Sequence, residues 1–256
     1  MNIIVLYSGG LGSWATAKVL KDQGHDLTLL FTDTRTEDED LYRWLVQSAG
    51  VIGAPLITLA DGRDVWQVFN DENFIGNTRV DICSRILKRD LARKWINANC
   101  DPADTAVAMG IDYTEIHRYD RAAPRWLPYQ LVAPLCDPPY VGRQDVQQWA
   151  KDAGLTLPRL YSWSPHNNCG GFCVKGGMGQ FAGLLRNMPE RYAYHEAQEA
   201  AFRERTGKDV AILKDRKGGP GIPLTLRSLR ERIETGQTET LPLDEFGGCG
   251  CMVDEA

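Results

Sequence analysis

Residues 3–13 read IIVLYSGGLGS, and this stretch decides the fold. A continuous apolar run ending in a glycine turn is typical of a strand buried on both faces of a sheet. Helical spacing begins directly after the turn. Glycines let backbone N–H groups approach an anion closely, and a helix N-terminus adds unpaired donors. The stretch therefore predicts a phosphate-binding loop between a first strand and a first helix, with a plain connecting turn as the alternative.

Outward from this loop, apolar runs alternate with helical patterns through the first half of the chain. Strands are expected at Asn2–Tyr7, Leu27–Thr32, Pro55–Leu59 and Thr105–Gly110, and helices at Ser13–Gln23, Leu41–Ala49 and Cys83–Ala98. Such alternation implies right-handed crossovers and an α/β fold with a doubly wound, mainly parallel sheet. Ligands bind beyond the C-terminal ends of the strands in such sheets. The segments to examine are therefore 8–13, 33–36 and 110–118.

After Pro124 the pattern changes, because prolines punctuate short elements. Further helices are expected near Gln144–Ala153, at Pro189–Arg205 and at Leu224–Ile233, with a turn-rich loop at Lys214–Gly221 and an aperiodic tail from Gly236. We expect two parts: a nucleotide-binding domain at 1–135, and a C-terminal region at 136–256 that carries a cysteine cluster and packs on the first domain. Trp44 and Trp66 are expected in the core, and His195 at the surface or at a helix cap.

Composition narrows the classes of partner. The chain has 256 residues, with 29 Lys plus Arg against 34 Asp plus Glu. This acidic balance excludes a protein whose whole surface binds nucleic acid, so a nucleic-acid acceptor would need a local basic patch in the C-terminal region. No apolar run reaches the ~18 residues of a membrane span, and the N-terminus lacks signal-peptide features. We expect no membrane contact and a cytoplasmic location, and we leave a homodimer open.

The motifs, taken in order, resemble the PP-loop ATP pyrophosphatase superfamily, whose signature is S-G-G-x-D-S. Ser8, Gly9, Gly10 and Ser13 match, whereas Gly12 stands in place of the usual Asp. Further similarity to the phosphoadenylylsulfate (PAPS) reductase-like branch lies at 31–37 (FTDTRTE), 83–88 (CSRILK), 110–118 (GIDYTEIHR) and 134–173. The resemblance covers residues 1 to about 175 and implies an adenine nucleotide alpha hydrolase-like fold.

This resemblance implies a site for ATP, with Mg²⁺ bridging the phosphates. The nucleotide-binding residues would be Ser8, Gly9, Gly10, Leu11, Gly12, Ser13, Phe31, Thr32, Asp33, Thr34 and Gly110. The catalytic residues would be Lys88, Arg118, Asp33 and Glu115. From the residues alone, Asp33 could equally cap a helix, and Glu115 with Arg118 could be a surface ion pair. We favour a phosphate ligand for Arg118, because it follows the end of a strand.

The cysteines suggest a metal. Seven cysteines in a reducing compartment disfavour a disulfide framework. Five of them lie in polar or glycine-rich surroundings and are the predicted metal ligands: Cys83, Cys169, Cys173, Cys249 and Cys251. The resemblance implies a [4Fe–4S] cluster, although Ser84 replaces one of the family's cysteines, so a tail cysteine would complete the set. Zinc is the alternative metal, and buried inert thiols are the non-metal alternative.

Together these features predict ATP-dependent adenylation of a substrate with release of pyrophosphate. An iron–sulfur cluster beside the site would link it to sulfur transfer, such as thiolation of a nucleic acid or a small molecule. Two alternatives remain. One is a reductase of an adenylylated sulfate, and the other is a non-catalytic nucleotide-binding or redox-sensing protein.

Overall fold

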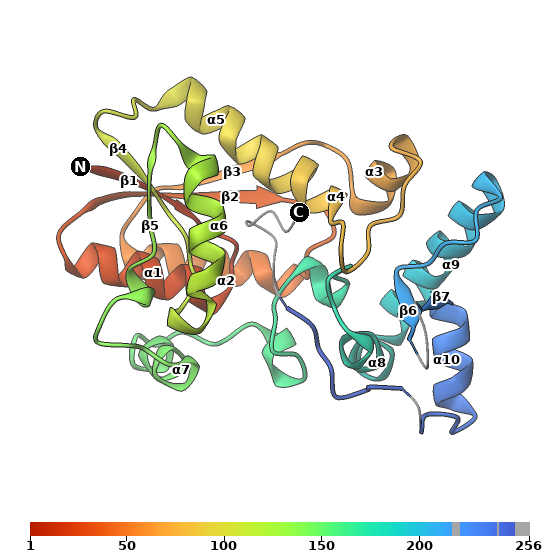
Figure 1. Ribbon diagram of the computed structural model, residues 1–256. Helices are drawn as coiled ribbons and strands as arrows, with labels where there is room; N and C mark the ends of the chain where they lie inside the picture. Colours follow the sequence, from red (N-terminus) through yellow and green to blue (C-terminus); the bar gives the residue numbers. More distant parts are fainter. Residues whose placement is uncertain (217–220, 240, 249–256) are drawn as a thin grey trace.

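A parallel sheet of five strands forms the centre of the protein. The computed structural model describes residues 1–216, 221–239 and 241–248. Strands β1 (Asn2–Leu6), β2 (Asp26–Asp33), β3 (Leu56–Ala60), β4 (Thr105–Ala108) and β5 (Gln130–Val132) pair in the order β3-β2-β1-β4-β5 (Figure 1). Every pairing is parallel, and Ile4 lies between Thr28 and Val107. The predicted α/β fold with a parallel sheet is confirmed.

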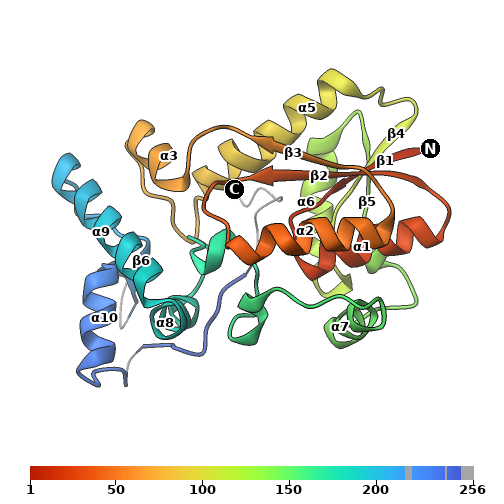
Figure 2. The same ribbon diagram turned by 180° about the vertical axis from the view of Figure 1, so that it is seen from behind.

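Helices cover both faces of this sheet because both sides of each central strand are apolar. In β1, Ile3 and Val5 face a core shared with α1 (Leu11–Asp22), α2 (Glu39–Ile52) and α7 (Arg143–Asp152). The alternate residues Ile4 and Leu6 face a second core, shared with α5 (Leu91–Asn99) and α6 (Ile116–Trp126). Figures 1 and 2 show α1, α2 and α7 on one side of the sheet and α5 on the other. Because α7 packs against α1, the segment after β5 belongs to the first core.

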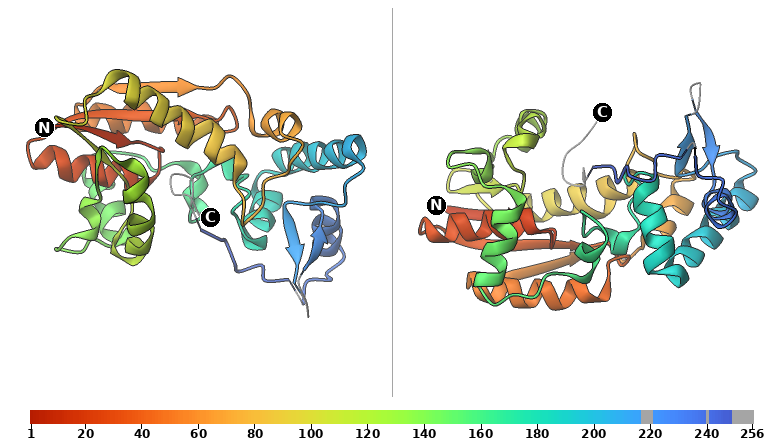
Figure 3. Two further views of the ribbon diagram at one scale, coloured as in Figure 1. Left: turned by 45° about the horizontal axis from the view of Figure 1, so that its top comes forward. Right: turned by 90° about the horizontal axis from the view of Figure 1, so that it is seen from below.

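A third apolar core holds the remaining elements. Its helices are α3 (Val65–Asp71), α4 (Ile82–Ser84), α8 (Met178–Asn187), α9 (Pro189–Thr206) and α10 (Leu226–Glu234), with the antiparallel pair β6 (Leu213–Asp215) and β7 (Ile222–Leu224). The buried Glu199 of α9 joins this lobe together, since its carboxylate accepts the backbone N–H groups of Ile212 and Leu226. Figure 3 shows α8, α9, α10 and the β6–β7 pair on the side of the molecule away from the N-terminus.

The expected helix 83–98 is divided by a wider turn. It consists of α4, a π-helical segment η1 (Arg85–Asp90) and α5. Within η1 the three consecutive residues Leu87, Lys88 and Arg89 are all buried. Lys88 pairs with Glu37 at 3.4 Å, and Arg89 pairs with Asp81 at 3.0 Å. Short π-helical turns occur often at functional sites, and this one turns two cations into the protein.

The described part of the tail runs across the start of α8. Gly247 pairs with Gly176, and the N–H groups of Gly177 and Gly179 donate to the carbonyls of Phe246 and Glu245. A Cβ on Gly177 would lie 2.2 Å from the Glu245 carbonyl oxygen, so only glycine permits this approach. Among the described residues, no helix is both long enough and apolar enough to cross a lipid bilayer.

His195 is buried in the third core, so its expected surface or capping role is wrong. Its Nδ1 accepts the indole N–H of Trp66 at 2.9 Å, and its ring stacks on Phe172 with centroids 3.6 Å apart. Burial lowers the pKa of His195 to about 3. Its partner Trp66 is 129 residues away along the chain, which is why no local pattern indicated it. The expected burial of Trp44 and Trp66 is confirmed.

The depressed pKa of His195 predicts acid sensitivity. In the unfolded chain this histidine takes up a proton near pH 6.5, whereas in the folded protein it stays neutral down to about pH 3. The contribution of His195 to the free energy of unfolding is therefore fully present above about pH 6.5. It falls by up to ~1.4 kcal/mol per pH unit as the pH is lowered toward 3. Urea unfolding at pH 7, 6 and 5 should show this slope in the wild type and in the exposed-site control His117→Gln. The slope should be shallower in His195→Gln. If the free energy of unfolding depends on pH equally in His195→Gln and in the wild type, His195 is not the source of the acid sensitivity.

Candidate functional site

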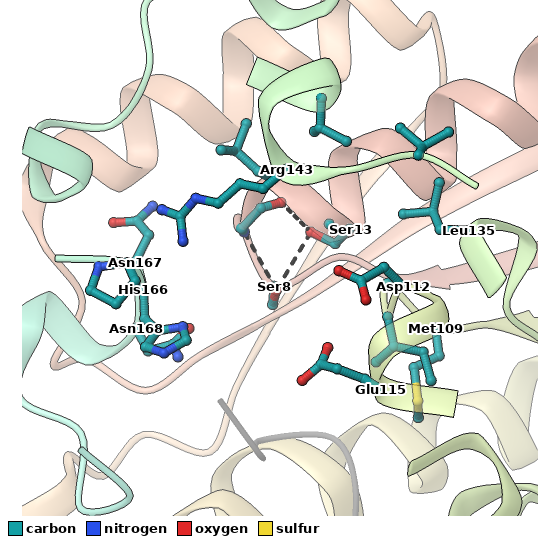
Figure 4. A pocket seen from close by; sticks show the side chains of 18 of the residues that line it. Ser8, Ser13, Met109, Asp112, Glu115, Leu135, Arg143, His166, Asn167 and Asn168 are labelled. Carbon is teal, nitrogen blue, oxygen red and sulfur yellow. Dashed lines mark hydrogen bonds between the residues drawn. The ribbon is translucent and has the colours of Figure 1, made fainter. Parts of the chain in front are cut away.

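The glycine turn after β1 is built as an anion-binding loop. Gly9 has a φ of +76°, and a Cβ there would lie 2.4 Å from Cδ1 of Leu41, so the turn requires glycine. Helix α1 begins at Leu11 and presents its first N–H groups to the loop. Ser13 donates to the Gly10 carbonyl at 2.8 Å, and Ser8 donates to Ser13 at 3.4 Å (Figure 4). Backbone donors, two hydroxyls and a helix N-terminus thus meet at one place.

The loop after β4 packs directly on this turn. A Cβ on Gly12 would lie 2.7 Å from the Gly110 carbonyl oxygen, and a Cβ on Gly110 would lie 2.5 Å from the Ser13 nitrogen. Both positions therefore need glycine because the two backbones touch. This contact gives a physical reason for Gly12 where the superfamily signature has Asp: no side chain fits there.

Past Gly110, the chain places two carboxylates and an arginine near the loop. Asp112 caps the short η2 turn (Tyr113–Glu115) by accepting the Thr114 N–H at 2.8 Å. Glu115 pairs with Arg118, which is buried at the start of α6. Within the described part of the chain, the Nε–H of Arg118 has no hydrogen-bond partner. In Figure 4 the carboxyl groups of Asp112 and Glu115 point into the open space beside Ser8.

A third wall comes from the segment that precedes the cysteine pair. The Nδ2 of Asn167 donates to the Gly9 carbonyl at 3.2 Å, while its buried Oδ1 has no partner in residues 1–216, 221–239 and 241–248. The neighbouring His166 ring contacts the Gly247 carbonyl through Nε2 at 2.9 Å. Tyr161 lies nearby, and its hydroxyl accepts the Leu11 N–H at 3.0 Å. This segment therefore contacts the anion-binding loop directly.

These three walls enclose a cavity of about 280 Å³, which we call the switch-point cavity. This volume is close to the lower end of the roughly 300–1,000 Å³ found for small-molecule pockets. The cavity lies beyond the C-terminal ends of β1 and β4, where the strand order reverses. In parallel α/β sheets this is the place where ligands bind.

Many of the predicted site residues meet in this cavity. Its lining includes the predicted residues Ser8, Gly10, Leu11, Gly12, Ser13, Gly110, Glu115 and Arg118. The lining does not include Gly9, Phe31, Thr32, Asp33, Thr34 or Lys88. Asp33 instead accepts the Tyr42 hydroxyl at 2.9 Å and the Arg35 N–H at 2.8 Å. The structure thus brings the loop together with Arg118 and Glu115, and it places the end of β2 elsewhere.

A second, smaller cavity collects the predicted thiols. Cys83, Cys169 and Cys173 are all buried and line it together with Lys88 and Lys175, and we call it the thiol cavity. Its volume of about 10 Å³ is near the minimum of ~10–15 Å³ that one water molecule requires. Among the described residues, no group of three or more His, Cys, Asp or Glu side chains is placed to hold a metal ion. The other two predicted ligands, Cys249 and Cys251, lie outside the described residues.

The structure adds residues to the switch-point cavity that the sequence did not assign to it. These are Asp112, Arg143, Tyr161, His166, Asn167 and Asn168. The last three directly precede Cys169 in the sequence. In the structure, Asn167 and Asn168 line the switch-point cavity while Cys169 and Cys173 line the thiol cavity. One segment, 167–173, therefore contributes to both.

No family model matches the chain. It is similar to argininosuccinate synthase from Xylella fastidiosa (strain Temecula1 / ATCC 700964), with 28% identity over 143 residues, 52% of this chain and 35% of that protein. The chain thus spans about a third of the length of this curated relative. Argininosuccinate synthase is a PP-loop enzyme, so the expected resemblance to PP-loop enzymes is confirmed.

Three solved structures align with the chain at low sequence identity. PAPS reductase from Candida auris, in a phosphate complex, aligns with a TM-score of 0.44 and 13% identity over 62% of this chain and 76% of that one. NMN synthetase from Francisella tularensis aligns with a TM-score of 0.44 and 13% identity, over 93% of this chain and 84% of that one. A predicted subunit of tRNA methyltransferase from Methanocaldococcus jannaschii DSM aligns with a TM-score of 0.36 and 18% identity, over 59% of this chain and 76% of that one.

The close contact between Gly12 and Gly110 leads to a prediction. Gly12→Ala should lower the free energy of unfolding by about 1–3 kcal/mol, because its Cβ would clash with the backbone carbonyl of Gly110, which cannot move away as a flexible side chain can. Gly50→Ala is the matched control: it lies in a helix with nothing within 4 Å of its added Cβ, and it should stabilise by ~0.5–1 kcal/mol. Urea unfolding measures both. A Gly12→Ala protein as stable as the wild type would show that the contact is not needed.

Proposed function

We propose that this protein is an ATP-dependent adenylating enzyme that releases pyrophosphate. The observation that carries the proposal is the switch-point cavity, which is lined by the anion-binding loop, the start of α1 and Arg118, whose Nε–H has no hydrogen-bond partner among the described residues. Backbone N–H groups at a helix N-terminus favour an anionic ligand such as a polyphosphate. The similarity to argininosuccinate synthase supports the same class of chemistry.

The lining of the cavity suggests how ATP would lie. The phosphates would rest on Ser8–Ser13, and the apolar side chains of Leu6, Met109 and Ile111 would receive the base. Magnesium is usually held by one or two carboxylates together with substrate phosphates. Asp112 and Glu115 offer such oxygens at this cavity, so the residues present fit that ion. When bound, magnesium would neutralise phosphate charge.

In the proposed reaction, an oxygen of the acceptor attacks the α-phosphorus of ATP. The bond to the bridging oxygen breaks, pyrophosphate leaves, and the acceptor carries AMP. Arg118 and the N–H groups of the loop would stabilise the charge that develops on the phosphate oxygens. A sulfur or nitrogen nucleophile would then displace AMP. Lys88, which pairs with Glu37 at the thiol cavity, would take no direct part in this step.

Arg118 provides the central test. Arg118→Lys keeps the charge but loses the planar fork, so ATP–pyrophosphate exchange should fall by roughly 10²-fold, a typical effect of removing one oriented donor. Arg121→Lys, an exposed residue of the same helix, should leave exchange unchanged. If the Arg118→Lys variant exchanges ATP and pyrophosphate at the wild-type rate, Arg118 has no part in the mechanism.

The same assay, run with labelled ATP and with adenylylated sulfate, separates the alternative functions. A reductase of adenylylated sulfate is favoured by one observation: the buried thiols share the wall segment 167–173 with the switch-point cavity. Sulfite release would support that reductase, and pyrophosphate release supports adenylation. Nucleotide binding without turnover would support a non-catalytic sensor.

The sulfur-transfer part of the proposal depends on the thiols. The described residues alone do not form a metal site, so a cluster would need Cys249 or Cys251 as well. What supports it is the pairing of Gly247, two residues before Cys249, with Gly176, three residues after Cys173. A [4Fe–4S] cluster is the favoured group, with zinc as the alternative, and no step above is routed through either.

A metal analysis tests this part. Anaerobically purified wild type should contain iron and sulfide, and Cys251→Ala should lose most of both. Cys100→Ser, a partly buried thiol far from the predicted set in sequence, serves as the control and should keep them. Iron content that is unchanged in Cys251→Ala would refute a ligand role for the tail. Stoichiometric zinc without iron would replace the cluster by the alternative metal.

The acceptor is proposed to be a small molecule or a nucleic acid. The basic C-terminal region offers less free charge than its sequence suggests, because several of its arginines pair with carboxylates. These pairs are Arg203 with Asp209, Arg227 and Arg230 with Glu196, and Arg232 with Asp215. This neutralisation favours a small-molecule acceptor.

A further inference from the structure

Arg143 is a cation at the switch-point cavity with no acidic partner in the described part of the chain. It is the first residue of α7 and lines the cavity. Its guanidinium lies over the ring of Tyr161, 5.4 Å from the ring centroid, and makes no ion pair or hydrogen bond with the described residues. An exposed arginine can be fully solvated, so its position alone does not indicate a ligand. The contacts of Tyr161 are a second observation that relates Arg143 to the anion-binding loop.

Tyr161 ties Arg143 to the anion-binding loop. The tyrosine hydroxyl accepts the Leu11 N–H at 3.0 Å, and Leu11 is the first residue of α1. A Cβ on Gly10 would lie 3.6 Å from the same hydroxyl, so the ring end lies directly against the turn. Arg143 is therefore held above the loop itself. A cation–π contact of this kind favours the side-chain rotamer of Arg143 that places its guanidinium over the ring.

Unused hydrogen-bonding groups on two walls indicate that a ligand completes the cavity. Among the described residues, the Nε–H of Arg118 is a buried donor without an acceptor, and the Oδ1 of Asn167 is a buried acceptor without a donor. Native proteins rarely leave buried polar groups unpaired without a function. Figure 4 shows Arg143 and Asn167 on the side of the cavity opposite Asp112 and Glu115.

We propose that Arg143 binds the polyphosphate part of the ligand, from the side opposite Arg118, and that Tyr161 is the residue that positions it. This inference rests on the proposed function, since it assumes that the loop holds a polyphosphate. A planar guanidinium can bridge two phosphate oxygens, and two such groups from α6 and α7 enclose the anion. Asn167 Oδ1 calls for an O–H or N–H group, which a ribose hydroxyl supplies and pyrophosphate does not.

Calorimetry with three probes tests this assignment: magnesium ATP, magnesium pyrophosphate and adenosine. Arg143→Gln should weaken both phosphate-bearing probes at least tenfold and leave adenosine unchanged. Arg143→Lys should recover only part of the loss, because an ammonium group lacks the fork. Tyr161→Phe keeps the ring and removes the bond to Leu11, so it should weaken pyrophosphate by several-fold. Lys151→Gln is the matched control, because it removes the same charge from the last turn of α7.

The outcomes separate this inference from the proposed function. If wild type binds ATP and Arg143→Gln binds pyrophosphate as tightly as Lys151→Gln, the role of Arg143 is overturned and the adenylating function stands. If wild type binds neither ATP nor pyrophosphate, both fall. Thermal unfolding of each variant checks that the fold is intact. A loss of adenosine binding together with pyrophosphate binding would mean that Arg143 only supports the structure, and would also overturn the assignment.

Discussion

The buried residue Glu37 connects four parts of the chain that are far apart in sequence. Its Oε1 accepts the Thr34 hydroxyl at 3.0 Å and the Lys88 ammonium at 3.4 Å, and its Oε2 accepts the Cys169 N–H at 2.7 Å. Its backbone carbonyl accepts a hydrogen bond from Arg191 at 3.0 Å. A carboxylate taken out of water is costly unless charge and hydrogen bonds compensate it. Here the residue after β2, the π-helical segment and the cysteine loop supply that compensation, while α9 binds the backbone of the same residue through Arg191.

This carboxylate also fixes the relation between the two cavities. Cys169 adopts a left-handed conformation with φ of 46°, followed by Gly170 and Gly171 with φ of 60° and 86°. The left-handed conformation is unfavourable for the non-glycine residue Cys169, whereas the two glycines adopt it readily. Glu37 supports the first, and Arg191 supports the second by donating to the Gly170 carbonyl at 3.0 Å. The segment can therefore turn Asn167 toward one cavity and Cys173 toward the other.

The sequence predicts the sheet and its binding loop well, because the information is local. An apolar strand, a glycine turn and a helix start follow one another in residues 2–22. The sequence does not predict α6 or α8, because each contains residues that disfavour a helix. These residues are Pro124 in α6, and Gly179 and Gly183 in α8. Those two glycines are required, because a Cβ on Gly183 would lie 2.7 Å from Trp163, and one on Gly179 would lie 2.6 Å from the Leu243 carbonyl. Packing therefore overrides helix propensity in α8.

The sequence predicts only part of the candidate site, because some of its residues come from segments that are far apart along the chain. Arg118 follows a strand end, so its position could be inferred, whereas Arg143 and Tyr161 reach the loop from segments far along the chain. Tyr161 is 150 residues from its partner Leu11. Conversely, Phe31–Thr34 lie at the C-terminal end of β2 but do not line the cavity, because the strand order reverses between β1 and β4 and not beside β2. The order of strands in space, which no local pattern encodes, decides which strand ends matter.

The crossing of the tail over α8 has a consequence for how the chain is made. The first amides of α8 donate to the carbonyls of Glu245 and Phe246, so they find their acceptors only after those residues have left the ribosome. The sheet, the anion-binding loop and α7 are complete much earlier in synthesis. The lobe that carries α8 therefore finishes folding after translation has passed Phe246, against a first core that is already formed.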